Sequence, residues 1–247
     1  MKKLLFVFLW CLVIVTGVCY ARSYSAIDSR ALRAPEINSQ EELSKLVSFL
    51  TDGYDKEEDK ARVILAWIVK NIDYDDYKFA QDQKAIKHPN SRRDFSVPES
   101  DILKVHLGVC RDIADLYVSM ASMANLKART VSGYAGNNLT LQNYDENIHA
   151  WVIVSIDGKE EFVDPTWAIN GGGRGATANI SNNYQYAAEL KRRESRTFHP
   201  NRSRSIDEDW FMTKPKTMIK THFPLNEEDQ LLKRPIKLQT FLRGTFK

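Results

Sequence analysis

The stretch GVCRDIADLYVSMASMANLKARTVSGYAG, residues 108–136, places a cysteine directly before an amphipathic segment. Apolar side chains recur at helical spacing over residues 112–125, which predicts a helix that starts beside Cys110. A thiol at a helix N-terminus feels the positive end of the helix dipole and unpaired backbone N–H groups, and both favour the nucleophilic thiolate. Gly108 should let the backbone turn tightly and leave open space beside the sulfur. After the helix, residues 130–134 are typical of a β-strand.

The N-terminus has the pattern of a secretory signal peptide over residues 1–21. Lys2 and Lys3 precede an apolar run of about 15 residues, and Cys19-Tyr20-Ala21 fits a small-x-small cleavage site. The run is short for a membrane span, which needs about 20 apolar residues. We therefore predict cleavage after Ala21 and a secreted or periplasmic protein of the cell envelope; an uncleaved anchor and lipidation at Cys19 are the alternatives. No later stretch is apolar enough to cross a bilayer, so no membrane span is expected after cleavage.

The cysteine content narrows the role of Cys110. The chain has three cysteines, and Cys11 and Cys19 both lie in the signal. A processed chain can therefore form no internal disulfide and no cysteine-based zinc site. A lone thiol in an oxidising compartment is either buried or used, and composition alone favours burial, because free cysteine behaves as a small core hydrophobe. The formal net charge of +3, which falls to about +1 when Lys2 and Lys3 are removed, indicates no class of partner.

Residues 22–247 suit a single domain, with helices first and strands later. Ser39-Gln40-Glu41-Glu42 has the pattern of a capping box, which opens a helix that ends at Gly53. A second amphipathic helix is expected over residues 56–72. Residues 76–99 are polar and aperiodic, and we predict a long loop there.

A β-hairpin is the clearest strand pattern. Residues 149–156, HAWVIVSI, end at Asp157-Gly158, a two-residue hairpin turn, and residues 161–163 return as the antiparallel neighbour. Helices followed by an antiparallel run predict an α+β fold. His149 heads the first strand and Asp164 follows the second, so both fall at the same end of the hairpin and Asp164 can reach the imidazole.

Cys110, His149 and Asp164 are candidates for a nucleophile, a base and an orienting carboxylate. In that logic the imidazole activates the sulfur, and the carboxylate fixes the tautomer of the imidazole. Taken singly, each residue has an ordinary explanation: a histidine at a strand start is commonly structural, and aspartate before proline commonly forms a turn. The order of the three on these predicted elements favours a catalytic triad.

Four blocks of the sequence resemble the transglutaminase-like superfamily. They are, in order, GVCRDIA (residues 108–114), ARTVSGY (128–134), HAW (149–151) and DPT (164–166). The resemblance covers about residues 60–168. The flanks, AWIVKNIDYD (66–75) and WFMTKPKTMIKTHFPLNEEDQLL (210–232), are similar to the kyphoscoliosis-peptidase-like branch. Residues 169–247 are then expected to be a family-like C-terminal extension of the same domain.

The resemblance implies a papain-like α+β core, in which a helix bearing the cysteine packs on an antiparallel sheet bearing the histidine and the aspartate. It also implies acyl transfer. The Cys110 thiolate would attack a carboxamide or peptide carbonyl, His149 would protonate the leaving amine, and an amine or water would resolve the thioester. Hydrolysis and cross-linking use the same triad, so the sequence does not separate them; we favour hydrolysis because no amine-binding pocket is visible. The expected partner is a protein or peptide substrate, with no cofactor.

Further site residues are expected around the triad. The Cys110 backbone N–H should supply one oxyanion donor, and Tyr74 or His106 is the candidate for the second. Tyr74 can equally be a packing residue, and His106 a residue that flanks a helix. Trp151 and Trp167 flank the triad in sequence; core packing explains both, and it is compatible with substrate binding and with shielding a thioester from water.

Other motifs favour ordinary roles. The sequence has no clustered Asp/Asn/Glu loop of the kind that binds calcium, so no metal is expected. The basic segment over residues 191–204 lacks the interleaved aromatics of a nucleic-acid strip, so we expect a solvated surface segment and no nucleic acid. The run Gly171–Gly175 is interpreted as a mobile loop rather than a phosphate loop. His199 and His222 lack a partner motif and are interpreted as surface or core residues.

Two classes of function stay open on the sequence. The first is an exported cysteine enzyme of the transglutaminase-like type. The second is a non-catalytic protein-binding module on the same scaffold. The intact set of Cys110, His149 and Asp164 favours the enzyme, because a retired site would be free to lose at least one of them.

Overall fold

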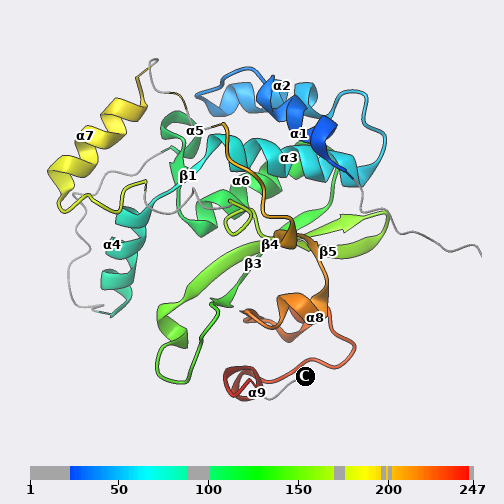
Figure 1. Cartoon of the computed structure of the whole chain (residues 1–247), viewed down its shortest axis with the longest axis vertical. Helices are drawn as coiled ribbons and strands as arrows, with labels where there is room; N and C mark the ends of the chain where they lie inside the picture. Colours follow the sequence, from blue (N-terminus) through cyan, green and yellow to red (C-terminus); the bar gives the residue numbers. More distant parts are fainter. Residues whose placement is uncertain (1–22, 88–100, 170–175, 196–198, 200–201, 245–247) are drawn as a thin grey trace, which may run out of the picture.

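The computed structural model describes residues 23–87, 101–169, 176–195, 199 and 202–244. The predicted signal peptide and the run Gly171–Gly175 lie outside these residues. Figure 1 shows helices gathered against a curved antiparallel sheet, which confirms the predicted α+β class. In the part of the chain that the structure describes, every helix is too short or too polar to span a bilayer.

The elements have the following bounds. The α-helices are α1 Ser25–Leu32, α2 Gln40–Thr51, α3 Glu57–Asn71, α4 Asp76–Lys87, α5 Ile102–Val105, α6 Cys110–Met123, α7 Asn183–Arg193, α8 Pro215–Met218 and α9 Leu238–Leu242. The 3-10 helices are η1 Tyr144–Glu146, η2 Glu208–Trp210 and η3 Glu227–Gln230. The strands are β1 Asp73–Tyr74, β2 Leu107–Gly108, β3 Ala128–Ala135, β4 Ile148–Ile156, β5 Lys159–Val163, β6 Phe211–Thr213 and β7 His222–Pro224.

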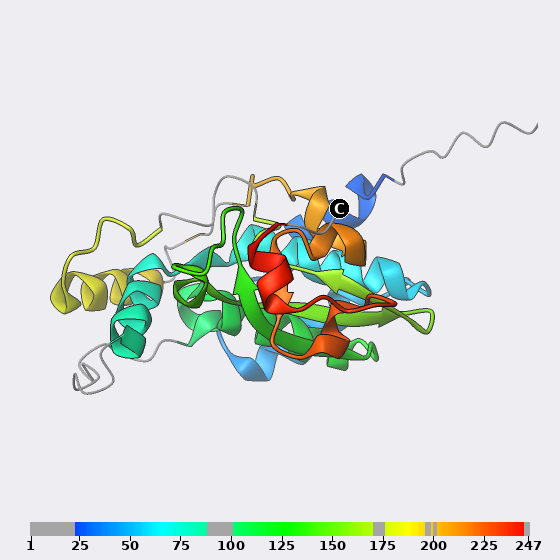
Figure 2. The same cartoon turned by 90° about the horizontal axis from the view of Figure 1, so that it is seen from below.

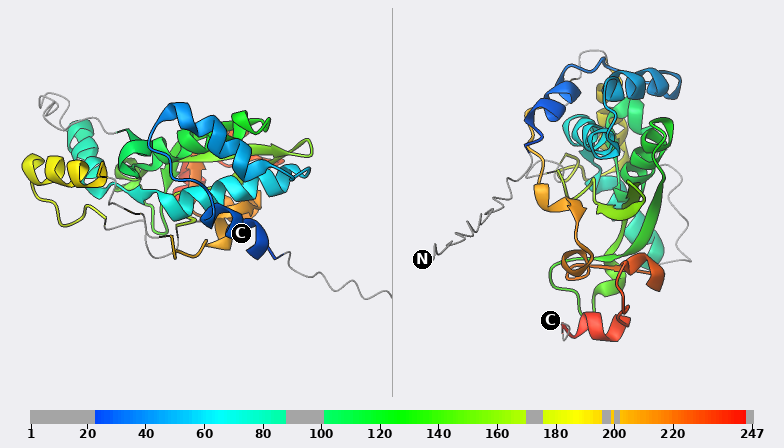
Figure 3. Two further views of the ribbon diagram at one scale, coloured as in Figure 1. Left: turned by 90° about the horizontal axis from the view of Figure 1, so that it is seen from above. Right: turned by 90° about the vertical axis from the view of Figure 1, so that its right-hand side faces the viewer.

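The central sheet has the strand order β6-β5-β4-β3-β7 and is antiparallel throughout. The main core joins helices α3 and α6 to one face of β4, through Ala150, Val152 and Val154. On the other face, Trp151 packs in a second cluster with Met218 of α8. Figure 3 shows the N-terminal helices and the C-terminal α9 at opposite ends of the molecule. The sheet thus separates two apolar layers, and alternate residues of β4 enter each of them.

The predicted hairpin is confirmed. β4 and β5 pair from Val152–Val163 to Ile156–Lys159. Asp157 and Gly158, between them, have φ angles of +51° and +79°. Positive φ at both central residues is the requirement of the type I′ turn, whose twist matches that of antiparallel strands. The turn therefore fixes the register that brings the far ends of the two strands together.

The helices predicted from periodicity are also confirmed, with small shifts at their ends. Helix α2 ends just before Gly53, which has φ +74°. At its start the Glu42 carboxylate accepts hydrogen bonds from the backbone N–H of Asn38 and from the Ser39 hydroxyl. A capping box instead requires the backbone N–H of Ser39 as the donor, so the predicted capping box is not formed. Helix α6 begins at Cys110, two residues earlier than the periodicity alone placed it.

The loop predicted over residues 76–99 is wrong for its first half, which forms α4, and residues 88–99 lie outside the described part of the chain. The Asp75 carboxylate accepts a hydrogen bond from the Lys78 backbone N–H at 3.0 Å and from the Tyr186 hydroxyl at 2.5 Å. Tyr77 stacks on Tyr186 at 4.8 Å between ring centroids. Figure 2 shows α4 and α7 side by side at one end of the molecule. Tertiary contacts with α7 hold this weakly amphipathic helix, so periodicity could not reveal it.

The prediction that residues 191–204 form a solvated segment is wrong at two positions. Arg193 and Arg204 are buried, with 5 % of each residue exposed. Both guanidinium groups form ion pairs with the Asp73 carboxylate, at 2.9 and 2.8 Å. Asp73 lies in β1, so the two arginines fasten the extension to the strand that pairs with β2. Buried arginine requires such a carboxylate partner, which lies far away in sequence.

An ion-pair cluster centred on a buried arginine joins the N-terminal helix to the C-terminal extension. Arg62 of α3 is fully buried. Its guanidinium donates to both carboxylate oxygens of Asp28 in α1, at 2.8 and 2.7 Å, and to both of Glu208 in η2, at 2.6 Å each. The group also lies over the rings of Tyr24 and Phe211, at 4.5 and 5.3 Å. One side chain therefore links three segments by two bidentate pairs.

Gly133 of β3 permits the close approach of β7 to the sheet. A Cβ at this position would lie 2.2 Å from the backbone oxygen of Phe223 and 2.6 Å from the indole carbon Cη2 of Trp151. Both distances are far below van der Waals contact, and one partner is backbone. Any side chain at residue 133 would therefore push β7 away from β3.

We expect Gly133→Ala to lower the free energy of unfolding by about 1–3 kcal/mol, because a packed sheet edge must shift to admit the methyl group. Urea unfolding followed by circular dichroism measures this loss. Gly136→Ala is the matched control, since its Cβ would meet the flexible end of the Leu139 side chain at 2.9 Å. Equal stability losses in the two variants would contradict the proposed role of Gly133.

Candidate active site

Cys110 lies at the start of α6, as predicted, and only 7 % of it is exposed. The Asp112 carboxylate, on the first turn, accepts hydrogen bonds from the Val109 backbone N–H at 3.1 Å and from Lys78 at 2.7 Å. These bonds fix the point at which the helix begins. The Cys110 backbone N–H belongs to the first turn, whose donors have no acceptor within a helix. The sulfur is thus both buried and placed at the positive end of the helix dipole.

The space beside Gly108 is not open, contrary to the sequence-based expectation. A Cβ at this residue would lie 2.8 Å from Ile102 Cδ1 and 3.0 Å from Asp112 Cβ. The glycine instead lets the short helix α5 pack closely against the start of α6. Its role here is close packing next to Cys110.

His149 and Asp164 meet at the open end of the hairpin, as predicted. His149 lies in β4, and Asp164 directly follows the last residue of β5. The His149 Nε2 and Asp164 Oδ2 atoms are 2.7 Å apart, and both residues are buried. Since Nε2 is used by the carboxylate, only Nδ1 of the ring is left for the interaction of His149 with the Cys110 side chain.

Both oxygens of the Asp164 carboxylate accept two hydrogen bonds each. Oδ1 accepts from the backbone N–H groups of Thr166 and Trp167, both at 2.9 Å. Oδ2 accepts from His149 and, at 3.0 Å, from Nε2 of His222. A carboxylate has about four acceptor sites, and all four are filled here. The Asp-Pro-Thr turn therefore holds one oxygen rigidly and presents the other to two imidazoles.

The electrostatics favour a charged pair. Burial alone lowers the pKa of His149, but the charge and hydrogen bond of Asp164 outweigh it, with a smaller contribution from Cys110, and raise that pKa well above 6.5. Burial alone raises the pKa of Asp164, but the charge and hydrogen bond of His149, together with the hydrogen bond from His222, hold it well below its usual range. The site is therefore suited to an imidazolium paired with the Asp164 carboxylate.

His222 is the site residue that sequence reasoning missed. It lies in β7 at the edge of the sheet and is 1 % exposed. Burial lowers its pKa, and the nearby charge of Asp164 only partly offsets this. The sequence signal was the resemblance of residues 210–232 to the kyphoscoliosis-peptidase-like branch, which marked the segment but not the residue.

The tryptophans expected near the triad do surround it. The ring centroid of Trp151 lies 6.1 Å from that of His149 and 5.1 Å from that of His222. Trp167 lies 5.9 Å from His149 and 4.5 Å from His222. Trp151 is fully buried in the second core cluster, whereas Trp167 keeps partial exposure. Packing against the two imidazoles is the contact that the structure gives both rings.

The two candidates for a second oxyanion donor differ in their surroundings. Tyr74 is buried in the same core cluster as Cys110 and lies opposite Gly108 in the β1–β2 pair. His106 has a left-handed backbone (φ +52°), and its Nδ1 lies 3.1 Å from the backbone oxygen of Asn71. One ring nitrogen of His106 is therefore already used at the flank of α5. Tyr74 pairs with a residue two positions before Cys110, and it is the candidate that we carry into the proposal.

His149, Asp164 and His222 bring donor atoms within 4.8 Å of one another, a grouping that can also hold a metal ion. Zinc would hold two such donors about 3.3 Å apart, given metal–ligand distances of about 2.0–2.1 Å. The observed separations of 2.7 and 3.0 Å are instead those of hydrogen bonds. We therefore interpret the three side chains as a hydrogen-bonded array.

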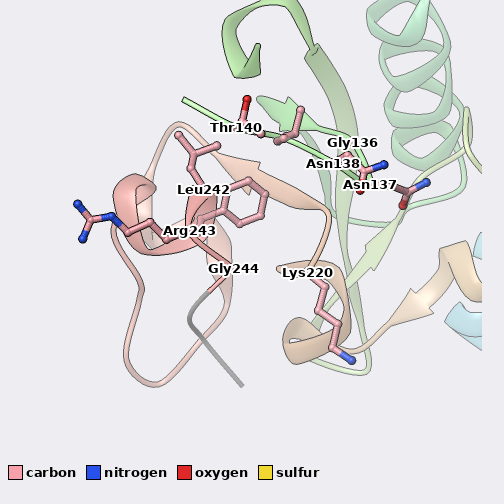
Figure 4. Close-up of a pocket in the computed structure, with 10 residues that line it drawn as sticks. Gly136, Asn137, Asn138, Thr140, Lys220, Leu242, Arg243 and Gly244 are labelled. Carbon is pink, nitrogen blue, oxygen red and sulfur yellow. The ribbon is translucent and has the colours of Figure 1, made fainter. Parts of the chain in front are cut away.

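A separate cavity of about 310 Å³ lies between the loop after β3 and helix α9 (Figure 4). Gly136 to Thr140 line one side, and Leu242 and Arg243 line the other. Neither Cys110 nor His149 lines this cavity. It is therefore distinct from the candidate active site.

Comparisons with known proteins identify the family of the chain. The sequence model of the transglutaminase-like superfamily matches residues 44–167, which include the cysteine, the histidine and the aspartate. Human kyphoscoliosis peptidase is 28 % identical over 211 residues, which cover 84 % of this chain and 27 % of the human protein. The mouse kyphoscoliosis peptidase is 28 % identical over 212 residues. The chain thus spans about a quarter of the length of these relatives, and the branch suggested by the flanking segments is supported.

Two solved structures are similar to the chain at lower identity. One is described as a TGase, with a TM-score of 0.35 and 18 % identity over 69 % of this chain and 39 % of the other. The second is the periplasmic domain of TgpA from Pseudomonas aeruginosa, with a TM-score of 0.37 and 17 % identity over 57 % of this chain and 47 % of the other.

Proposed function

Because the chain belongs to the transglutaminase-like superfamily, with its cysteine-protease-like or acyltransferase scaffold, we propose that it is an exported cysteine enzyme acting on protein or peptide amides. The observation that carries this proposal is the buried contact of 2.7 Å between His149 and Asp164, with the Cys110 side chain interacting with the same imidazole. The base and the orienting carboxylate are thus in contact, and the Cys110 side chain acts on the same imidazole, which supports the arrangement that acyl transfer requires.

The proposed reaction has two steps. The Cys110 thiolate attacks the carbonyl carbon, the carbon–nitrogen bond breaks, and the leaving amine takes the proton from Nδ1 of His149. The acyl group is then held as a thioester on the sulfur. In the second step water or an amine attacks the thioester, gives its proton to His149, and the thiolate leaves. Asp164 keeps the other nitrogen, Nε2, protonated throughout.

The proposal includes an oxyanion site at the start of α6. The Cys110 backbone N–H is proposed to donate to the oxygen that becomes negative in the first step. Tyr74 is proposed as the second donor, with His106 as the alternative. Trp167, which is partly exposed next to the imidazole, is proposed to contact the substrate. Trp151 is proposed to shield the thioester from water.

Export is proposed from the N-terminal sequence. Lys2 and Lys3, the apolar run and the site at Ala21 fit a cleaved signal. Mass spectrometry of the protein recovered from the exporting cell tests this, because cleavage leaves Arg22 as the new N-terminus.

The pH dependence of Cys110 alkylation tests the proposed triad without a known substrate. At pH 6 an unperturbed thiol with a pKa of about 8.5 is almost wholly protonated, whereas a thiol paired with imidazolium is ionised. We expect His149→Ala to slow alkylation by iodoacetamide at pH 6 by roughly 100-fold relative to the wild type. Rates are measured by quenched mass spectrometry.

His199→Ala is the matched control, because His199 is exposed and pairs with Glu36 on the surface. It should react like the wild type at every pH. A wild-type pH profile of Cys110 alkylation that matches an ordinary thiol and is unchanged by His149→Ala would contradict the proposed enzyme activity. It would favour a protein-binding module on the same scaffold. Mass analysis of a glutamine-containing peptide incubated with and without an added amine then separates cleavage, deamidation and cross-linking.

A further inference from the structure

The second imidazole on Asp164 is not needed to complete a triad. Asp164 is already fixed by two backbone N–H groups on Oδ1 and by His149 on Oδ2. His222 nonetheless reaches Oδ2 at 3.0 Å, and its ring is buried. A buried polar group held this way needs a reason beyond filling space, since an apolar ring would pack at lower cost.

The hydrogen bonds of His222 define its tautomer. An ionised carboxylate only accepts, so the proton on the Asp164 side must be carried by Nε2 of His222. On the other side of the ring, the Thr221 hydroxyl lies 2.8 Å from Nδ1, much closer than its other acceptor, the Met218 backbone oxygen at 3.5 Å, and can donate to the ring. Both ring nitrogens are therefore satisfied with a single proton on the ring. This is the neutral Nε2–H form.

The surroundings of His222 are three tryptophan rings and two titratable groups. Trp151, Trp167 and Trp210 enclose the ring, with centroids at 5.1, 4.5 and 5.2 Å. The titratable groups that face it are Asp164, after β5, and His149, in β4, whose centroid lies 5.5 Å away. A proton on His222 would put two imidazolium ions on one carboxylate in a buried site. The neutral form is therefore favoured while His149 is charged.

We propose that His222 is a positioning residue: as a neutral donor it shares Asp164 Oδ2 with His149 and limits how strongly the carboxylate holds the His149 proton. This inference rests on the proposed function. A hydrogen bond to a carboxylate stabilises the anion and lowers its basicity. Asp164 with two imidazole donors therefore stabilises the His149 imidazolium less than it would with one.

The sharing suits the proton transfer in the proposed reaction. His149 must keep its proton while the thiolate attacks and then release it to the leaving amine. A general acid works best when its pKa is not far above the working pH. Asp164 and the thiolate both raise the pKa of His149, and a second donor on the carboxylate opposes that rise.

Two variants separate the donor from the shape of the ring. His222→Phe keeps a ring among the three tryptophans but removes the hydrogen bond. His222→Gln keeps an N–H donor in place of Nε2. NMR of 15N-labelled histidine follows the protonation of His149, and each variant is measured at the pH where the wild-type ring is half protonated. We expect His222→Phe to raise the pKa of His149 by about one unit, so that about nine-tenths of the ring is protonated there, and His222→Gln to leave it near one half.

Trp210→Phe is the control for packing, because it alters the wall around His222 without removing a hydrogen bond. It should lower the thermal midpoint and leave the protonation of His149 unchanged. Equal protonation of His149 in the wild type and in His222→Phe would overturn the proposal, and so would a shift of equal size in Trp210→Phe.

A measurement on the wild type covers the case in which a variant fails to fold. Long-range 1H–15N spectra report the tautomer of each imidazole directly, and they should show His222 as neutral Nε2–H between pH 5 and 8. A charged His222 in this range would overturn the inference. The alkylation profile distinguishes the two proposals. If Cys110 alkylation depends on His149 but is unchanged in the His222 variants, the proposed enzyme activity is retained and only the proposed role of His222 is contradicted.

Discussion

Replacing Asp164 by asparagine is expected to reduce acyl transfer by roughly 10⁴-fold. Oδ1 of Asp164 accepts from two backbone N–H groups, so the carbonyl oxygen of the new amide must stay there. Its NH2 group then takes the place of Oδ2 and faces Nε2 of both His149 and His222. A donor cannot bond to a donor, so His149 must move its proton to Nδ1. The neutral ring then holds its proton on Nδ1 and cannot take the proton of the Cys110 thiol, so the thiolate–imidazolium pair does not form.

The measurement for Asp164→Asn is the rate of Cys110 acylation by a peptide substrate, with alkylation at pH 6 as a substrate-free companion. Both should fall, while the far-UV circular dichroism stays native. Asp115→Asn is the matched control, because Asp115 lies on the exposed side of α6, where its side chain is 54 % exposed. An Asp164→Asn protein that is folded and as reactive as this control would show that the carboxylate does not orient His149.

Removal of the Arg62 guanidinium should have the largest effect on stability. In Arg62→Met the carboxylates of Asp28 and Glu208 lose their shared partner, and Asp28 is left mostly buried without it. Breaking a buried ion pair by removing one partner costs about 3–5 kcal/mol. For a chain of this size we expect the thermal midpoint to fall by about 6–20 °C, measured by calorimetry.

Arg192→Met is the matched control for that prediction. Arg192 also forms a bidentate pair, with Glu189 at 2.7 and 2.6 Å, but its own side chain is 57 % exposed, and Glu189 keeps Arg193 as a second partner at 2.8 Å. Such a pair contributes about 0–1 kcal/mol, so the thermal midpoint should change little. A loss of stability in Arg62→Met no greater than in Arg192→Met would mean that α1 and η2 are held to α3 by apolar packing alone.

The parts of the fold that local pattern determines could be predicted from the sequence. The apolar spacing of α2, α3 and α6 and the Asp157-Gly158 turn act within a few residues, and each element formed where its pattern placed it. Helix α4 could not be found in this way. Its capping carboxylate, Asp75, is satisfied by Tyr186, and Tyr77 stacks on the same residue across more than a hundred positions.

The same distinction applies to the candidate site. The helix pattern placed Cys110 at the start of α6. The register of one hairpin placed His149 and Asp164, so the contact between these two residues followed from local structure. His222 enters on a strand of three residues, too short to show a period, and its partner is 58 positions away. The ion pairs of Arg193 and Arg204 with Asp73 could not be predicted for the same reason. A basic run is expected to be solvated from sequence alone, because its carboxylate partner is distant in sequence and only the fold brings the two together.

The place of β7 in the sheet also sets the order in which the site can be built during synthesis. A nascent polypeptide emerges with the sulfur, the first imidazole and the carboxylate well before residue 222 exists. Until β7 docks beside β3, one acceptor position of that carboxylate stays open to water. The fourth member of the array is thereby tied to the completion of a distant sheet edge, and a polypeptide that stalls before this point holds only the other three.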